Sequence, residues 1–229
     1  MKARPMPAWD GTPAHGKAIQ EQLAPQVRRM PELGPVSRVV GADVGGFRRG
    51  PVRAAAVVVS YPDLALVEYQ VAEASVTFPY VPGLLAFREA PVVAAALEKL
   101  SVDPDLLLVD GQGLAHPRRM GIACYLGLMF DIPTIGCAKS RLIGQHDPVP
   151  DEVGAWTELR DDGEVIGAVL RTRRRSAPLY VSIGHKVDLA AAVHWVLATC
   201  RGYRLPQPPR LAHLAASGQS LVHLTLPSP

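Results

Sequence analysis

The sequence has little cysteine, no long apolar segment and no internal repeat, and each absence narrows the class of protein. Its three cysteines, Cys124, Cys137 and Cys200, are far apart, which excludes a disulfide framework and a cysteine metal site. This usage predicts a reducing compartment, and we expect a cytoplasmic protein. No segment is apolar over a length that would span a bilayer. Residues 1–7 lack the apolar core of a signal peptide, so none is expected.

The composition is that of an ordinary globular protein. A chain of 229 residues with 48% hydrophobic content suits one domain with a full-sized core. We predict a single domain over residues 1–216 and a poorly ordered tail over 217–229. The net charge of +3 permits a polyanionic partner without requiring one. Arginines cluster at 48–49, 118–119 and 171–175, where a solvated face is the alternative to a polyanion contact.

The hydrophobic patterning predicts a mixed α/β fold. A helix should begin at Thr12-Pro13, run towards Met30, and be kinked or ended early by Pro25. The pattern then predicts, in chain order, strands over 37–44, 53–60 and 64–72, a helix over 84–99, a strand over 105–110, a helix over 117–130, a strand over 133–137, further strands within 156–182, a helix over about 187–200 and a short one from about Pro209 past His213. Short links indicate an antiparallel meander for the first three strands, and the β-α-β passage indicates parallel pairing. This is the order of the ribonuclease H-like fold, a mixed sheet with helices on both faces.

Two aspartates stand at the ends of predicted strands. Asp43 precedes the pair Gly45-Gly46, and Asp110 precedes Gly111. Because open α/β sheets bind ligands beyond their strand ends, both carboxylates are candidates for a cleft. Two neighbouring carboxylates repel each other unless a cation lies between them, and Mg²⁺ prefers carboxylates with water and phosphate oxygens. The structural alternative is that each aspartate caps a turn.

Glu89, Lys139 and His213 extend this pair to a candidate catalytic set. Glu89 lies early in a predicted helix and could complete the metal site. Lys139 follows a strand and would stabilise charge, while His213 would transfer a proton. A metal held by Asp43 and Asp110 would activate water for attack on a phosphodiester. The alternatives are a glutamate that favours the helix dipole and a histidine that is structural.

The loop Pro79-Tyr80-Val81-Pro82-Gly83 presents an aromatic residue shortly before Glu89. Two prolines restrict the backbone on either side of Tyr80, and Gly83 frees the exit. A tyrosine held at a loop tip can insert between bases. Alternatively, it folds back and seals the edge of the sheet. The carboxylates nearby favour the first interpretation.

Several long segments carry a resemblance to one known family. They are FPYVPGLLAFRE (78–89), DLLLVDGQGLAHPRR (105–119), DIPTIGCAKSR (131–141), GHKVDL (184–189), CRGYRLP (200–206) and RLAH (210–213). These segments resemble endonuclease V, the deoxyinosine 3′ endonuclease family. The similarity covers most of residues 5–216.

The resemblance implies a nuclease that depends on Mg²⁺, for which Mn²⁺ can substitute. Such an enzyme hydrolyses the second phosphodiester 3′ to a deaminated base, chiefly deoxyinosine, and leaves 3′-hydroxyl and 5′-phosphate ends. Asp43 and Asp110 match the direct metal ligands, and Glu89 matches the third acidic residue of the site. Lys139 and His213 match further catalytic positions.

The resemblance also implies contacts with the nucleic acid. Tyr80 matches a wedge beside the lesion, and Pro82, Gly83, His116 and Arg118 are the other predicted DNA-binding residues. The lesion base would rotate out into a pocket, which costs least for a mispaired base. The expected substrate is single- or double-stranded DNA containing deoxyinosine, with inosine-containing RNA also open, and the expected state is a monomer.

Two positions depart from the family pattern. Gly46 stands where an aromatic residue is usual, with Phe47 beside it. Gln112 stands where some relatives carry histidine, which removes a titratable group near the metal. Both departures bear on rate and lesion preference.

Two other functions remain open. The first is a different ribonuclease H-like nuclease, such as a junction resolvase or an RNA-cutting relative. The second is a binding module that has lost catalysis. The Tyr80 loop favours a lesion reader over a resolvase, and the presence of both Asp43 and Asp110 counts against lost catalysis.

Overall fold

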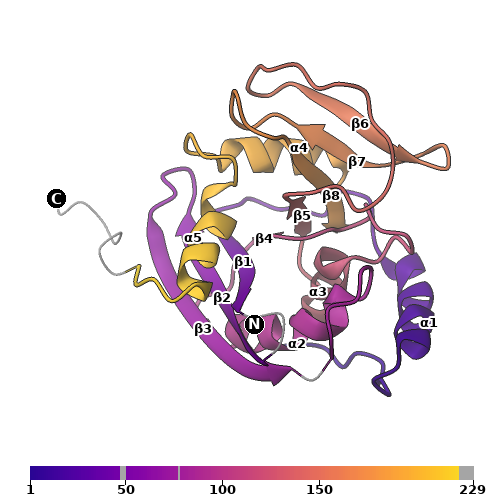
Figure 1. Cartoon of the computed structure of the whole chain (residues 1–229). Helices are drawn as coiled ribbons and strands as arrows, with labels where there is room; N and C mark the ends of the chain where they lie inside the picture. The colour runs from indigo at the N-terminus through magenta and orange to yellow at the C-terminus, as the bar shows by residue number, and fades with distance from the viewer. Residues whose placement is uncertain (47–49, 77, 222–229) are drawn as a thin grey trace.

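The fold is built on one eight-stranded sheet with the strand order β3-β2-β1-β4-β5-β8-β7-β6 (Figure 1). The computed structural model describes residues 1–46, 50–76 and 78–221. Its elements in chain order are α1 (Pro13–Leu23), the 3-10 turn η1 (Ala24–Gln26), β1 (Arg38–Gly46), β2 (Gly50–Ser60), β3 (Leu66–Val76), α2 (Leu85–Leu97), β4 (Leu106–Val109), α3 (Ile122–Phe130), β5 (Thr134–Ala138), β6 (Trp156–Asp161), β7 (Glu164–Leu170), β8 (Leu179–His185), α4 (Leu189–Ala198) and α5 (Gln207–Ala216).

The strand pairing confirms the predicted ribonuclease H-like fold. β1, β2 and β3 form an antiparallel meander, and β4 and β5 extend the sheet from β1 in parallel. Beyond β5 the sheet becomes antiparallel again through β8, β7 and β6. None of the described helices has the length and apolar content that a membrane crossing requires.

Backbone conformation explains where two helices begin and end. The first helix ends early, at Leu23, as predicted, because Pro25 in the following 3-10 turn has no N–H to continue the helical bonding. α3 begins at Ile122 rather than at residue 117, since Arg119 has a φ of 52°, which lies outside the right-handed helical region.

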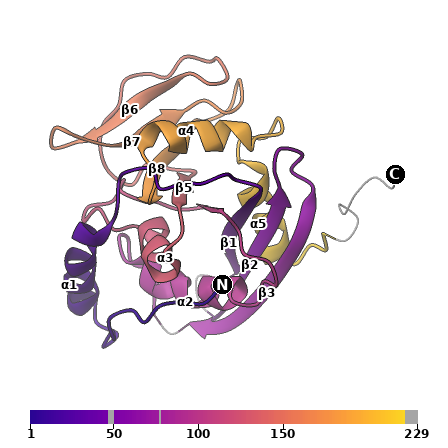
Figure 2. The same ribbon diagram turned by 180° about the vertical axis from the view of Figure 1, so that it is seen from behind.

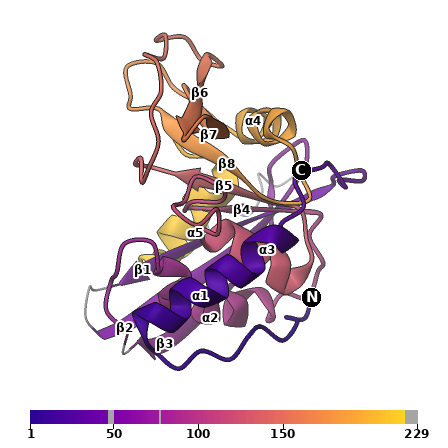
Figure 3. The ribbon, with the colours of Figure 1, turned by 90° about the vertical axis from the view of Figure 1, so that its right-hand side faces the viewer.

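Successive residues of the central strands point to opposite faces, and helices cover both. In β2, Ala54, Ala56 and Val58 pack in the cluster that includes residues of α1, α2 and α3. Val57 and Val59 pack in the cluster that includes α4 and α5. α5 lies in front of β1 and β2 in Figure 1 and behind them in Figure 2, and Figure 3 shows α1 alongside α2 and α3. Burial of both faces explains why this strand reads as a continuous apolar run.

Part of the expected tail and the whole of the arginine cluster 48–49 lie outside the described residues. Of residues 217–229, the structure describes 217–221, and Leu221 is buried with the α4 and α5 side of the core. Residues 222–229 lie outside the described ranges, as do Phe47, Arg48 and Arg49. The three cysteines are free thiols, in keeping with their wide spacing.

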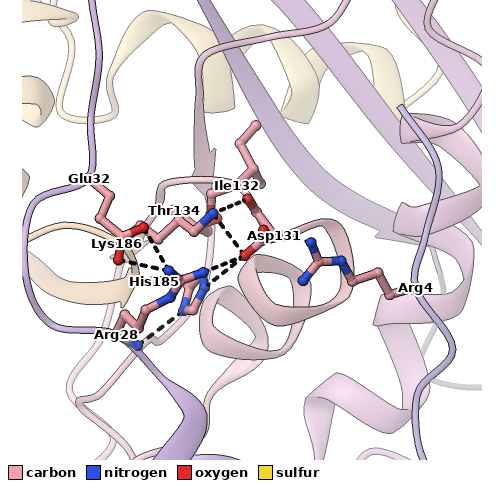
Figure 4. A network of polar contacts seen from close by, with 8 residues as sticks. All are labelled: Arg4, Arg28, Glu32, Asp131, Ile132, Thr134, His185 and Lys186. Atoms are coloured by element: carbon pink, nitrogen blue, oxygen red, sulfur yellow. Dashed lines mark hydrogen bonds and ion pairs between the residues drawn. The ribbon is translucent and has the colours of Figure 1, made fainter.

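Asp131 joins three distant parts of the chain at the end of α3 (Figure 4). Its carboxylate lies 2.7 Å from Arg4 Nη2 and 2.8 Å from both Arg28 Nη2 and Lys186 Nζ. The buried His185 ring lies 3.5 Å away. Burial works to raise the pKa of Asp131, but Lys186, Arg4 and Arg28 outweigh it and lower that pKa to about 2. The ionised Asp131 carboxylate therefore stabilises the folded state.

Asp131→Asn is expected to cost about 1–2 kcal/mol of stability at neutral pH, after allowance for solvent screening. The unfolded pKa of Asp131 is about 3.8 and the folded pKa about 2. Its contribution is therefore complete above about pH 4 and is lost as the pH falls towards 2. Asparagine tolerates the left-handed backbone at this position, where φ is 52°. Urea unfolding at a series of pH values should show the difference from wild type shrinking over this window.

Asp147→Asn, an exposed change in the β5–β6 connection, is the matched control and should show no such pH dependence. A stability difference for Asp131→Asn that stays constant from pH 7 to pH 3 would contradict the electrostatic explanation.

Candidate active site

The strand register places the two predicted aspartates side by side. In the parallel β1–β4 ladder, Ala42 pairs with Val109. The next residues along the chain are Asp43 and Asp110, which therefore stand on the same face. Asp110 directly follows β4, as predicted, whereas Asp43 lies within β1, which continues to Gly46 instead of ending at the glycine pair. The N–H of Asp110 donates to the carbonyl of Ala42 at 3.1 Å, which continues the pairing.

Two glycines of β1 allow α5 to lie directly on the strand beside Asp43. A Cβ at Gly41 would lie 2.0 Å from the backbone of the first turn of α5, and a Cβ at Gly45 would lie 2.7 Å from the backbone of its last turn. No side chain fits at either position. This close approach brings His213 Nδ1 to 2.7 Å from Asp43 Oδ2.

Asp43, Asp110 and His213 form the one group of potential metal ligands within the part of the chain that the structure describes. One ligand atom from each lies within 4.8 Å of the others. The two aspartates are largely buried, whereas the His213 side chain is 48% exposed. Lys139, directly after β5, forms an ion pair with Asp110, and Arg204 donates to the Lys139 carbonyl.

Negative charge at this site is under-compensated. Burial first, and then the Asp110 carboxylate, raise the pKa of Asp43 to about 6, although Lys139 and His213 oppose the shift. Burial, together with Asp43 and Asp110, raises the pKa of Glu89 to about 8. Glu89 is not in the three-residue group, and its predicted role in the metal site stays a prediction.

The donor set fits a hard divalent cation. Asp43 and Asp110 offer carboxylate oxygens on the neighbouring strands β1 and β4, and the half-exposed His213 side chain borders them on the solvent side. A cation between the carboxylates would remove the repulsion that raises the pKa of Asp43. Two carboxylates with open positions are the arrangement that Mg²⁺ uses with phosphate substrates.

Tyr80 is an exposed residue of its loop. Its exposed fraction of 59% favours a tyrosine free at the loop over one folded back onto the edge of the sheet. Gly83 has a φ of 78°, a conformation that favours glycine, and it turns the chain from the loop towards α2.

His116 and Arg118, predicted to contact DNA, are bonded beneath this loop. His116 Nε2 lies 2.9 Å from the Gly83 carbonyl oxygen, and Arg118 Nη2 donates to the same oxygen at 2.8 Å. Arg118 N–H lies 3.1 Å from His116 Nδ1. Burial lowers the pKa of His116 to about 4. A neutral ring with its proton on Nε2 satisfies both contacts.

The other arginines of the predicted clusters divide between the interior and the surface. Arg119 pairs with Asp161 and Glu164 at 2.9 and 2.7 Å. The Arg171 guanidinium donates to the backbone carbonyls of Val149 and Pro150. Residues 173–175 are exposed. Among the clustered arginines that the structure describes, those at 173–175 keep the solvated character that arginine runs usually have.

A pocket of about 440 Å³ opens beside the carboxylates. Its lining includes Tyr80, Pro82 and Gly83 of the loop, together with Asp110 and Lys139. A pocket of this volume accommodates a small organic ligand such as a nucleobase. Because Asp110 belongs both to the pocket lining and to the metal-ligand group, a base held here would place its backbone next to the carboxylates.

Gln112, one of the two departures from the family pattern, also lines this pocket. Its amide Nε2 donates to the carbonyl of Ser140 at 2.8 Å. The side chain thus links the turn after β4 to the segment after β5. The neutral Gln112 amide therefore forms this link at the position where some relatives carry a titratable histidine.

Gln20 is a site residue that the sequence interpretation missed. It lines the pocket and is 1% exposed. A signal was present, because Gly16, Ile19 and Leu23 mark the buried face of α1 and Gln20 is the polar residue on it. A buried amide must be hydrogen-bonded, so such a residue points to a specific contact.

Comparison with known proteins identifies the family. A model of the family described as Endonuclease V matches residues 21–214. An endonuclease V of Dehalococcoides mccartyi is 50% identical over 218 residues, covering 95% of this chain and 98% of the relative. An endonuclease V structure from Bacillus subtilis matches with a TM-score of 0.90 and 30% identity, covering 95% of this chain and 96% of that one. Ciona intestinalis endonuclease V, in complex with a 24mer DNA containing an inosine followed by a ribo-adenosine, matches with a TM-score of 0.78 and 26% identity, covering 90% and 96%. This chain therefore belongs to the endonuclease V family.

Proposed function

We propose that this protein is a DNA repair endonuclease that cleaves the second phosphodiester 3′ to a deoxyinosine, with Mg²⁺ as its cofactor. The observation that carries the proposal is the shared position of Asp110 in the metal-ligand group and in the pocket lining. The inosine-containing DNA bound by the Ciona intestinalis relative supports this substrate class. Neither the Asp43 nor the Asp110 ligand is lost, which argues against a module that only binds.

The side chains of the site have distinct roles in this proposal. Asp43 and Asp110 would hold the cation, which when bound would supply an activated water and neutralise charge on the phosphate. His213, held through Nδ1 by Asp43, keeps Nε2 available for proton transfer at the reacting oxygens. Lys139 places a positive charge beside Asp110, where it stabilises the negative charge that develops on the phosphate.

The start of α2 supports the proposed preference for a deaminated base. Leu85 and Ala86 belong to the pocket lining and to the first turn of the helix, whose N–H groups have no acceptor within the helix. Deamination replaces the exocyclic amino group of adenine, a donor, with a carbonyl, an acceptor. N–H donors that face the base would bind the carbonyl of hypoxanthine. In adenine they would meet the amino group, a second donor, which is a mismatch that sites of this kind reject.

The cut position tests the proposal. End-labelled oligonucleotides with a single deoxyinosine, incubated with Mg²⁺, should yield one fragment that ends at the second phosphodiester 3′ to the lesion. A matched strand with inosine in RNA measures the sugar preference. Release of the free base without a nick would indicate a glycosylase, and paired cuts at a four-way junction would indicate a resolvase. Either outcome would overturn the proposal.

A further inference from the structure

Gln20 connects two segments that line the pocket. Its Nε2 donates to the carbonyl of Gly83 and to the carbonyl of Met120, both at 3.0 Å. Gly83 ends the Tyr80 loop, and Met120 immediately precedes Gly121, which lines the pocket together with Gln20 itself. One buried amide on α1 therefore holds both segments at fixed distances.

The third contact of Gln20 orients the amide. Its Oε1 accepts from Arg118 Nε at 2.7 Å, while Arg118 Nη2 reaches the Gly83 carbonyl that Gln20 also binds. With His116, three side chains converge on this one carbonyl oxygen. Such a closed network specifies one geometry, since each polar group has a partner.

We propose that Gln20 is a positioning residue that sets the spacing between the Tyr80 loop and the Met120–Gly121 segment, and thereby the selectivity for an extruded deaminated purine. The inference rests on the function proposed above. Gln20 is buried under the pocket, so it acts through the backbone groups that it holds.

The chemistry of these contacts requires a glutamine. The position needs two donors for the carbonyls and one acceptor for Arg118, on a side chain that reaches all three. Glutamate keeps the acceptor and loses both donors, and methionine keeps the volume and loses every hydrogen bond. Without Gln20, the Gly83 and Met120 segments are no longer held by a common side chain. The distance between them then varies, and the affinity that falls most is that for the duplex whose extruded base fills the pocket.

The test compares Gln20→Met with wild type in duplex binding. Dissociation constants for a deoxyinosine duplex and for the unmodified duplex are measured in Ca²⁺, and kcat and KM are then measured in Mg²⁺. We expect the binding ratio between the two duplexes to fall about tenfold, with affinity for the unmodified duplex unchanged and the loss in cleavage mainly in KM. Gln22→Met, an exposed glutamine on the same helix, is the control and should retain the wild-type ratio.

Two outcomes would overturn the inference. A purely structural role would lower the active fraction and weaken binding to both duplexes equally, which leaves the ratio unchanged. A wild-type ratio in Gln20→Glu, which lacks the donors, would do the same. By contrast, a wild type that does not prefer the deoxyinosine duplex would refute the proposed function itself.

Hydrogen exchange of the wild type decides the question if both variants fail to fold. The amides of Leu84 and Gly121 are bonded to the carbonyls of Val81 and Gly113. If Gln20 couples the two segments, these amides should exchange through one common opening. Independent exchange with different free energies of opening would overturn the inference.

Discussion

Asp110→Asn is expected to lower the rate of deoxyinosine-directed cleavage by about a thousandfold or more. Asparagine preserves the shape of the side chain and removes the charge that faces Asp43 and pairs with Lys139. Single-turnover cleavage of a labelled deoxyinosine duplex in Mg²⁺ measures the loss. Binding of the same duplex in Ca²⁺ should remain measurable, because Ca²⁺ accepts more and longer oxygen contacts than the octahedral geometry of Mg²⁺ allows.

A thermal shift separates loss of the cation from loss of the fold. Mg²⁺ should raise the melting temperature of the wild type, since a ligand that binds only the native state stabilises it, and should have little effect on Asp110→Asn. Asp147→Asn, an exposed change outside both the metal-ligand group and the pocket lining, should behave as the wild type in both assays. Full cleavage activity of Asp110→Asn would refute the metal site.

The central half of the fold and its two aspartates could be predicted because local patterns determine them. Apolar runs with short links predict the meander, and a strand ending in an acidic residue before a glycine predicts a carboxylate at the sheet edge. The register of β1 with β4 then makes Asp43 and Asp110 neighbours. Nothing in the local pattern gives that register, which depends on packing across the whole sheet.

Long-range packing explains what could not be predicted. Gly45 was interpreted as part of a turn after Asp43, whereas it lies within β1 and makes room for α5. His116 and Arg118 were assigned to DNA from the family resemblance, and that role stays a prediction. Nothing in the local pattern indicated that both side chains bind the Gly83 carbonyl. A charged or titratable side chain does not reveal its partner when that partner is a backbone group some thirty residues away along the chain.

These contacts link the Tyr80 loop, to which we assign base recognition, with the carboxylates to which we assign cleavage. The Tyr80 loop is bonded through Gly83 to the turn that follows β4, the strand whose end is Asp110. β1 is paired with β4 and carries Asp43, which in turn holds His213. Displacement of the Tyr80 loop would therefore reach Asp110, directly after β4, through Gly83, His116 and the segment that joins His116 to β4. This short path is why variants of the loop should affect selectivity before they affect overall stability.

Tyr80→Ala is expected to reduce the preference for deoxyinosine over unmodified duplex by about ten- to a hundredfold. The ring is 59% exposed at the pocket and its backbone lies between two prolines, so it has free area to stack on the bases flanking an extruded lesion. An aromatic ring contributes about 1–3 kcal/mol when it stacks on a base. The ratio of kcat/KM for the two duplexes measures the preference.

Tyr80→Phe is the matched control, because it keeps the ring and removes only the hydroxyl. If stacking carries the effect, the phenylalanine variant should retain nearly the whole preference, and the two variants should share the wild-type melting temperature since the side chain is exposed. If the phenylalanine variant loses as much as the alanine variant, the hydroxyl acts as a hydrogen-bonding group instead. An unchanged preference in Tyr80→Ala would show that the tyrosine only shapes its loop.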